Sequence, residues 1–138
     1  MKKIMVLLTF IFALAVSANA QKKMHKIVFE ITSADTADQR TVLRQINNVY
    51  KDVPNTQVEI VCHGPAIFML VKDKTVLLPE MQSLADKYGV RFAACNNSMR
   101  KNNIETSQLV PVAVVVPNGV MEVVTKQEDA WSYIKAGH

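Results

Sequence analysis

The stretch Val90-Arg91-Phe92-Ala93-Ala94-Cys95-Asn96-Asn97-Ser98 decides the fold that this sequence predicts. Residues 90–94 have the length and apolar content of a buried parallel strand, and Gly89 before them is typical of a helix end. The three polar residues after Cys95 are helix N-cap types, so a short helix is expected through residues 99–101. Cys95 would then lie at the positive end of a helix, where backbone N–H groups lower a thiol's pKa. It is a candidate reactive thiol, and the alternative is a small buried core residue.

Strand-like and helix-like segments alternate on both sides of that stretch. Residues 26–32, 57–62 and 111–116 are further predicted strands, and 131–134 could be a last, short one. Helices are predicted where apolar residues recur at three- and four-residue spacing: through Val42, Leu43, Ile46, Val49 and Tyr50 after capping candidates Ser33, Thr36 and Asp38, through 79–88, and over 120–126. Residues 66–71 are an apolar run that could form a short helix. The alternation predicts a three-layer α/β/α domain with a mainly parallel sheet.

A second group of chemically interesting residues follows the predicted strand at 57–62. Cys62 closes this strand, and His63 stands next to a Gly-Pro pair that marks a sharp exit. Right-handed crossovers gather the loops after parallel strands at one edge of the sheet, so Cys62, His63 and Cys95 should share that edge. Core packing is the simpler expectation for Cys62, and a loop histidine satisfied by backbone groups is the simpler one for His63.

The first residues are typical of a targeting segment. Lys2 and Lys3 precede an apolar run over residues 4–16, and Ala18-Asn19-Ala20 is a cleavage signal. We therefore expect residues 1–20 to be a signal peptide and residues 21–138 to form one exported domain, periplasmic or secreted, with no membrane attachment after cleavage. Loss of the two lysines lowers the net charge from +4 to +2, which is too small an excess to indicate nucleic-acid binding.

The sequence contains only two cysteines, Cys62 and Cys95. In an exported protein they could form one structural bridge, act as a redox pair, or remain independent thiols. A metal or haem site would rest on Cys62 and His63 alone, whereas a closed zinc site needs four ligands. We therefore expect no metal and no cofactor.

Several familiar catalytic patterns are absent from the sequence. It has no G-x-G-x-x-G or Walker A pattern for nucleotides, no G-x-S-x-G elbow of a hydrolase and no C-x-x-C redox pair. Thiol chemistry at Cys62 and Cys95 is what remains.

Three segments together resemble a known family. Val-Glu-Ile-Val-Cys-His-Gly-Pro at 58–65, Tyr-Gly-Val-Arg-Phe-Ala-Ala-Cys-Asn-Asn-Ser-Met at 88–99, and Val-Val-Pro-Asn-Gly-Val at 115–120 look like the DsrE/DsrF-like family of sulfur-relay proteins. The resemblance implies a five-stranded parallel sheet, assembly into homo-oligomers and, in active members, a cysteine that carries sulfur as a persulfide. Cys95 matches that cysteine. Relay members act in the cytoplasm, and the export signal is a departure from them.

The resemblance also bears on the two thiols. It implies that the second and third strands are neighbours, about 4.8 Å apart, so a redox-switchable pair of Cys62 and Cys95 is one expectation.

The residues and the resemblance leave two hypotheses open. The first is an exported protein that handles sulfane sulfur on Cys95, with Cys62 and His63 as auxiliary residues and with donor and acceptor proteins as partners. The alternative is a non-catalytic oligomeric binding or structural module, in which both cysteines are core residues or form a disulfide. Reaction of the folded protein with a thiol reagent separates the two.

Overall fold

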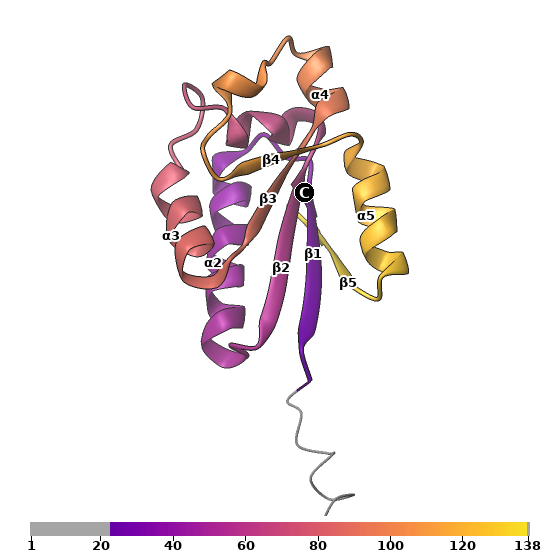
Figure 1. Cartoon of the computed structure of the whole chain (residues 1–138). Coiled ribbons are helices and arrows are strands. Elements are labelled where there is room, and N and C mark those ends of the chain that lie inside the picture. Colours follow the sequence, from indigo (N-terminus) through magenta and orange to yellow (C-terminus); the bar gives the residue numbers. More distant parts are fainter. Residues whose placement is uncertain (1–22, 138) are drawn as a thin grey trace, which may run out of the picture.

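The computed structural model describes residues 23–137, so the predicted signal peptide lies outside the described residues. Strands and helices alternate along the chain (Figure 1). The elements, in chain order, are β1 (His25–Ile31), α2 (Thr36–Asp52), β2 (Thr56–Cys62), the 3₁₀ helix η1 (Gly64–Leu70), α3 (Leu78–Tyr88), β3 (Arg91–Cys95), α4 (Asn96–Lys101), the 3₁₀ helix η2 (Thr106–Gln108), β4 (Ala113–Val116), α5 (Gly119–Glu128) and β5 (Ser132–Ala136).

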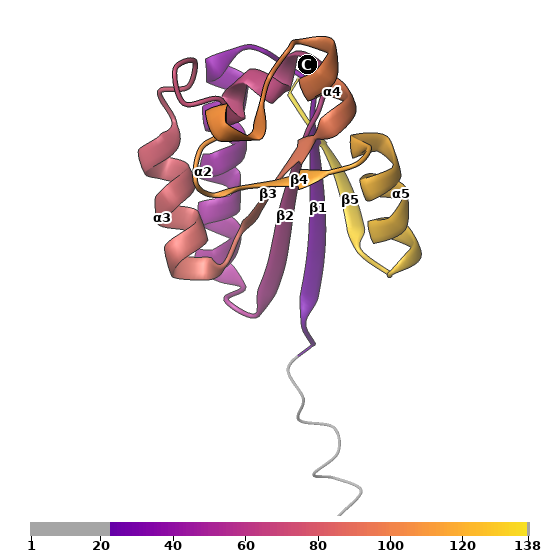
Figure 2. The ribbon, with the colours of Figure 1, turned by 45° about the horizontal axis from the view of Figure 1, so that its top comes forward.

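The five strands form one sheet in the order β4-β3-β2-β1-β5, and every neighbouring pair is parallel. Helices α2 and α3 cover one face and α5 covers the other, whereas α4 lies at the end of the sheet where the strands finish (Figures 1 and 2). The predicted three-layer α/β/α fold with a five-stranded parallel sheet is confirmed. The second and third strands are neighbours, as the family resemblance implied.

The face under α2 and α3 holds the larger hydrophobic core. Fully buried side chains such as Phe29, Ile46, Ile60 and Phe92 fill it, and all of them come from the apolar pattern of the sequence. The rings of Tyr50 and Tyr88 stack with centroids 4.2 Å apart where α2 meets the end of α3. This face carries most of the apolar burial that stabilises the fold.

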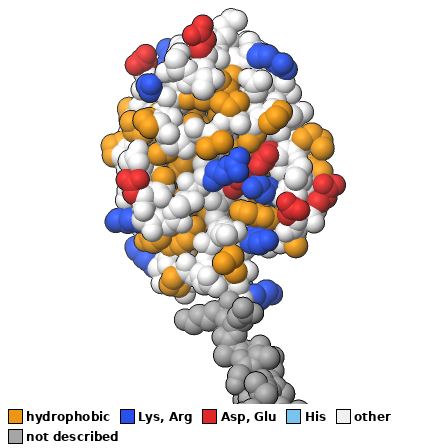
Figure 3. Space-filling model, viewed as in Figure 1, with side chains coloured by type: hydrophobic (Ala, Val, Ile, Leu, Met, Phe, Trp, Pro, Cys, Tyr) orange, Lys and Arg blue, Asp and Glu red, His pale blue; other side chains and the backbone are white. Residues whose placement is uncertain are grey.

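The face under α5 is built differently. Its buried apolar cluster contains only Val28, Val61, Ala93, Val116 and Val123. Acidic and basic side chains gather beside α5 on the surface (Figure 3). Successive strand residues point to opposite faces, so each strand contributes to both environments.

The helix ends correct two details of the sequence prediction. The N-cap of α2 is Asp35, whose carboxylate accepts a hydrogen bond from Ala37 N at 2.8 Å, and not one of the predicted Ser33, Thr36 or Asp38. The N-cap of α4 is Cys95 itself, because the helix starts directly after β3 with no intervening loop. The predicted end of α3 is confirmed, since Gly89 adopts the left-handed conformation with φ 69°.

The last two strands are shifted from their predicted ranges. β4 begins at Ala113 because Pro111 has no N–H for the ladder and Ala113 N bonds Val110 O at 3.0 Å in a turn. β5 begins at Ser132 because Trp131 N still bonds Lys126 O at 2.9 Å at the end of α5.

Candidate functional site

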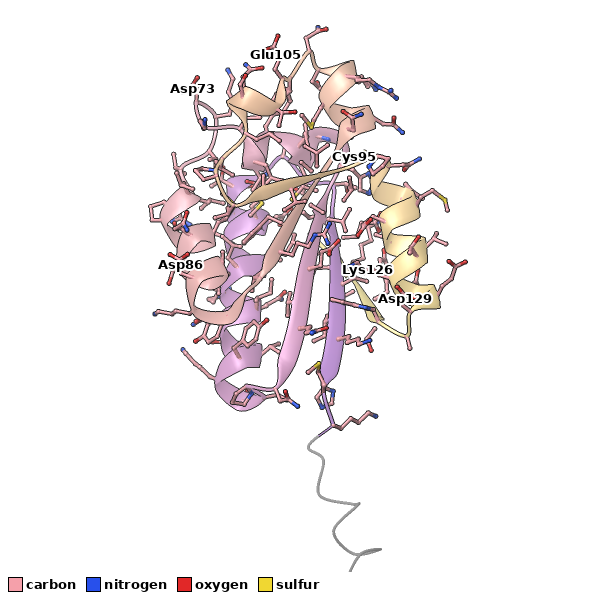
Figure 4. The ribbon with its side chains drawn as sticks, viewed as in Figure 1. Asp73, Asp86, Cys95, Glu105, Lys126 and Asp129 are labelled. Carbon is pink, nitrogen blue, oxygen red and sulfur yellow. The ribbon has the colours of Figure 1, made fainter. Side chains whose placement is uncertain are left out.

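Cys95 lies where β3, α4 and the start of α5 meet (Figure 4). It is the last residue of β3, pairs with Val116 of β4, and is only 4% exposed. The covering layer is thin, because Asn97 on α4 and Pro117 before α5 are both exposed. The thiol is therefore buried immediately below the surface, at the carboxyl edge of the sheet.

A backbone N–H group contacts the sulfur directly. Gly119 N, the first residue of α5, donates to Cys95 Sγ at 3.1 Å. This approach depends on glycine, because a Cβ at position 119 would lie 3.0 Å from His63 Cβ and 3.1 Å from Cys95 Cβ. Asn118 caps α5 by accepting from Val120 N at 3.0 Å, which fixes the helix start over the thiol.

The surroundings of Cys95 favour its thiolate. Burial raises the pKa of Cys95, but the N–H groups of Ser98, Gly119 and Asn97, together with the Ser98 hydroxyl, lower that pKa by more. The net pKa is below the ordinary value of 9.0. A lowered pKa is the property that distinguishes a nucleophilic cysteine from an inert core cysteine.

His63 borders the same glycine, so the structure brings it beside Cys95 as the shared sheet edge predicted. Its Nε2 lies 2.6 Å from Glu30 Oε1, and the hydroxyl of Tyr133 donates to the other oxygen of Glu30. Burial raises the pKa of Glu30, but the hydrogen bonds with Tyr133 and His63 lower that pKa by more, so the net shift is downward. The hydrogen bond to Glu30 in turn raises the pKa of Tyr133 to about 12.

Ser98 ties the loop of His63 to the helix that follows Cys95. Its hydroxyl accepts a hydrogen bond from Gly64 N at 2.8 Å and is itself nearly buried. The residue after His63 is thereby anchored to the first turn of α4. This contact holds the two predicted site segments in a fixed relation.

Cys62 lies at the same end of the sheet but on the opposite face. It pairs with Ala94, which belongs with it to the larger core, whereas Cys95 is one residue further and points to the other side. Both cysteines are free thiols. Burial raises the pKa of Cys62 to about 12. The expected redox pair of Cys62 and Cys95 is therefore not formed in the structure, although β2 and β3 are neighbours, because the two thiols lie on opposite faces of the sheet. Cys62 packs in the core.

A charged cluster that no sequence pattern indicated lies under α5. Glu59 is 0% exposed, with Lys126 Nζ 2.8 Å and Arg91 Nε 3.4 Å from its Oε2. Burial raises the pKa of Glu59 by more than the two cations lower it, and Glu122 adds to the rise. Lys126 also lies 4.5 Å from the centroid of the Trp131 ring, so the polar contacts of α5 centre on this lysine (Figure 4).

Other kinds of site are not supported within residues 23–137. This part of the chain has no group of three or more His, Cys, Asp or Glu side chains placed to hold a metal ion. None of its helices has the length and apolar character needed to cross a membrane. An open groove of about 500 Å³ lies between α2 and α3, lined by Arg40, Arg44 and Glu80 among others, on the face of the sheet away from Cys95.

Sequence reasoning missed four residues of the edge: Glu30, Ser98 as a tether, Gly119 and Tyr133. One signal was available for Glu30, which interrupts the apolar run over residues 27–31 at a position on the same face as Val28. Gly119 was quoted only as part of the 115–120 segment of the family resemblance, and no pattern assigned it a contact with the thiol. Tyr133 gave no signal, because its partner Glu30 is more than a hundred residues away.

Comparison with known proteins places the fold among solved structures. The family model described as DsrE/DsrF-like family matches residues 8–136. The chain is similar to a protein of unknown function, MTH1491, from Methanobacterium thermoautotrophicum, with 25% identity, a TM-score of 0.76, and coverage of 80% of this chain and 98% of that one. It is also similar in fold to the ychN protein of E. coli, with 10% identity, a TM-score of 0.67, and coverage of 82% and 99%. A search of curated proteins finds no match.

Proposed function

The chain belongs to the DsrE/DsrF-like family, and from that premise we propose that it handles sulfane sulfur, carried as a persulfide on Cys95. One observation supports this most directly: Gly119 N–H donates to Cys95 Sγ at 3.1 Å and, with the first turn of α4, lowers the pKa of the thiol. A sulfur carrier needs a thiolate that can attack a donor and then leave again. Both steps are easier for a thiol of lowered pKa.

The transfer conserves atoms and electrons. The Cys95 thiolate attacks the outer sulfur of a donor persulfide R–S–SH, the donor S–S bond breaks, and its electron pair leaves with R–S⁻. The product is a persulfide on Cys95, and the moving sulfur keeps its oxidation state, so no oxidant is required. An acceptor thiolate reverses the process and releases Cys95 as a thiolate.

Access to the sulfur requires a small local movement. At 4% exposure, Cys95 is covered by the start of α5 and by the connection from β4 through Pro117 and Asn118. Short surface segments of this kind open far more readily than core strands. In this proposal, displacement of this connection admits the donor.

The proposal includes the location and the assembly of the protein. A basic start, an apolar run and an Ala-x-Ala signal in residues 1–20 support export, with mature residues 21–138 acting in the periplasm or outside the cell. The family relationship supports a homo-oligomer that exchanges sulfur with donor and acceptor proteins.

Mass spectrometry tests the sulfur-carrying role. The chain without residues 1–20 is reduced, desalted, incubated with inorganic polysulfide and measured intact. The parent protein and Cys62→Ala should each gain one sulfur atom, which cyanide then removes as thiocyanate, and Cys95→Ser should gain none. Equal loading of Cys95→Ser would contradict the proposal.

One observation favours a second candidate function, a non-catalytic module. Cys62 and Cys95 are 0% and 4% exposed, which is also the burial of structural cysteines. The same experiment separates the candidates, since a structural module would leave both thiols unloaded and silent to alkylation in the folded protein.

A further inference from the structure

Three polar side chains are hydrogen-bonded in series, and the first of them, His63, lies next to Cys95 across Gly119. Tyr133 of β5 donates to Glu30 of β1, and Glu30 lies 2.6 Å from His63 Nε2 after β2. The His63 and Glu30 side chains are each only 18% exposed. The register of the parallel strands β1 and β5 places Tyr133 close to Glu30, and Tyr133 itself is 39% exposed, so the pair of His63 and Glu30 is the shielded part of this arrangement.

The hydrogen bond between Glu30 and His63 determines which imidazole nitrogen is available for proton transfer. The contacts with Tyr133 and His63 hold the pKa of Glu30 below its usual value, so the group is a carboxylate at neutral pH and only accepts hydrogen bonds. Nε2 of His63 must therefore donate to it. This leaves Nδ1 as the nitrogen that can gain or lose a proton.

The imidazole and the thiol meet at Gly119. A Cβ built at this glycine would lie 3.3 Å from His63 Cγ, the ring atom bonded to Nδ1, and 3.1 Å from Cys95 Cβ. The N–H of the same glycine contacts Sγ. Because position 119 has no side chain, its backbone lies in close contact with both the imidazole ring of His63 and the side chain of Cys95.

We propose that His63 is the proton-transfer residue of the sulfur step at Cys95, held in its working orientation by the positioning residues Glu30 and Tyr133. This inference rests on the proposed sulfur-carrying function and assigns the acid-base part of the same site. It gives a role to the carboxylate and the phenol that are hydrogen-bonded in series to His63, the neighbour of Cys95.

Each half of the cycle moves one proton. On loading, protonated His63 gives its Nδ1 proton to the departing R–S⁻, so the donor leaves as a neutral thiol. On unloading, neutral His63 takes the proton of an acceptor thiol R′–SH. The resulting R′–S⁻ attacks the outer sulfur of the Cys95 persulfide, the S–S bond breaks, and its electron pair returns to Sγ, where Gly119 N–H stabilises the thiolate.

The other groups around the pair define the controls. From β1, Glu30 faces His63. From β5, both Tyr133 and Lys135 face Glu30. From α4, the N–H groups of Asn97 and Ser98 face the sulfur of Cys95. Lys135 interacts with Glu30 by charge alone. Lys135→Met therefore retains both hydrogen bonds of Glu30 and serves as a matched control.

Single-turnover transfer tests the inference. Polysulfide-loaded protein is mixed with a low-molecular-weight thiol, and loss of sulfur from Cys95 is followed by quenched intact mass between pH 5 and pH 9. Removing a general acid-base group typically costs about 100-fold or more, so His63→Ala should slow transfer by about 100-fold and flatten its pH profile. Added imidazole should restore part of the rate.

The positioning residues should give a graded result. Glu30→Gln should slow transfer by about tenfold and Tyr133→Phe by about threefold, both less than His63→Ala. Lys135→Met should slow transfer by less than either. If His63→Ala loads normally and transfers with the parent's rate and pH profile, this inference is wrong and the sulfur-carrying role stands. If the parent itself never loads sulfur on Cys95, the proposed function fails and this inference fails with it.

Discussion

Cys62 and Cys95 end neighbouring strands at the same edge of the sheet, yet they lie in opposite environments. Cys62 faces the core under α2 and α3, where burial raises its pKa to about 12. Cys95 faces α5, where N–H donors lower its pKa in spite of burial. Burial alone therefore does not set the thiol pKa in this fold, because the N–H donors around Cys95 outweigh the effect of burial.

The same contrast holds for the two faces of the sheet. One face stabilises the fold through a large apolar core, whereas the other combines a small valine cluster with Glu59, Glu30 and Cys95. Sites that carry chemistry commonly depart from the apolar pattern that specifies a fold. The predictions below test this division.

Alkylation should show the largest difference between the faces. The pKa of Cys62 is about 12 and that of Cys95 is below 9.0, so their thiolate populations at neutral pH differ by at least about a thousandfold. Iodoacetamide labelling of the folded protein, read by peptide mass spectrometry, should modify Cys95 while Cys62 stays unmodified. In denaturant the two should react alike. Equal labelling of Cys62 and Cys95 in the folded protein would show that the two faces do not differ in thiol reactivity.

Truncation of core side chains should show the next largest difference. Phe92→Ala on the α2/α3 face should lower the free energy of unfolding by about 3–5 kcal/mol, because a fully buried ring leaves a cavity. Val123→Ala on the α5 face removes less apolar area from a smaller cluster and should cost about 1–2 kcal/mol. Urea unfolding measures both. A larger cost for Val123→Ala would show that α5 contributes more to stability than its contacts indicate.

The sequence was sufficient to predict the strands and helices of both faces and insufficient to predict the contacts around Cys95 on the smaller one. Helix spacing in α2, the glycine that ends α3 and the apolar runs of β2 and β3 are local patterns, and local patterns set the elements of an open parallel sheet. The position of Cys95 between β3 and α4 followed from one continuous stretch.

The contacts around Cys95 were beyond the sequence because they are not local. Gly119 is separated from Cys95 by 24 residues, and His63 from Glu30 by 33 residues. Opposite orientation of the two thiols depended on register: Cys62 pairs with Ala94, and a shift of one residue would have put both sulfurs on one face. No pattern within a single segment specifies that register.

Replacing Gly119 should alter the thiol more than the fold. In Gly119→Ala the new Cβ meets His63 Cβ at 3.0 Å and Cys95 Cβ at 3.1 Å, so α5 must move outward, at a cost of about 1–3 kcal/mol. The N–H group then moves away from Sγ, and the pKa of Cys95 should rise towards that of an ordinary cysteine. Measuring thiolate absorbance against pH tests this. Val120→Ala, an exposed position of the same helix, is the control and should leave that pKa unchanged.

The smallest expected effects come from two carboxylates on the α5 face whose pKa values shift in opposite directions. The pKa of Glu30 is lowered, so its ionised form adds stability at neutral pH that is lost as pH falls through the folded-state pKa. The pKa of Glu59 is raised, so its ionised form costs stability at neutral pH and the cost disappears on acidification.

Urea unfolding between pH 7 and pH 3 should separate these carboxylates. At pH 7, Glu30→Gln should be less stable than the parent and Glu59→Gln equally or more stable, each by about 1 kcal/mol or less. Both differences should shrink towards pH 3, since the parent carboxyls then become neutral, as Gln already is. If Glu59→Gln were strongly destabilised at pH 7, the ion pairs with Lys126 and Arg91 would outweigh the cost of burying the charge. The α5 face would then contribute to folding through its charges, and the division between the two faces would fail.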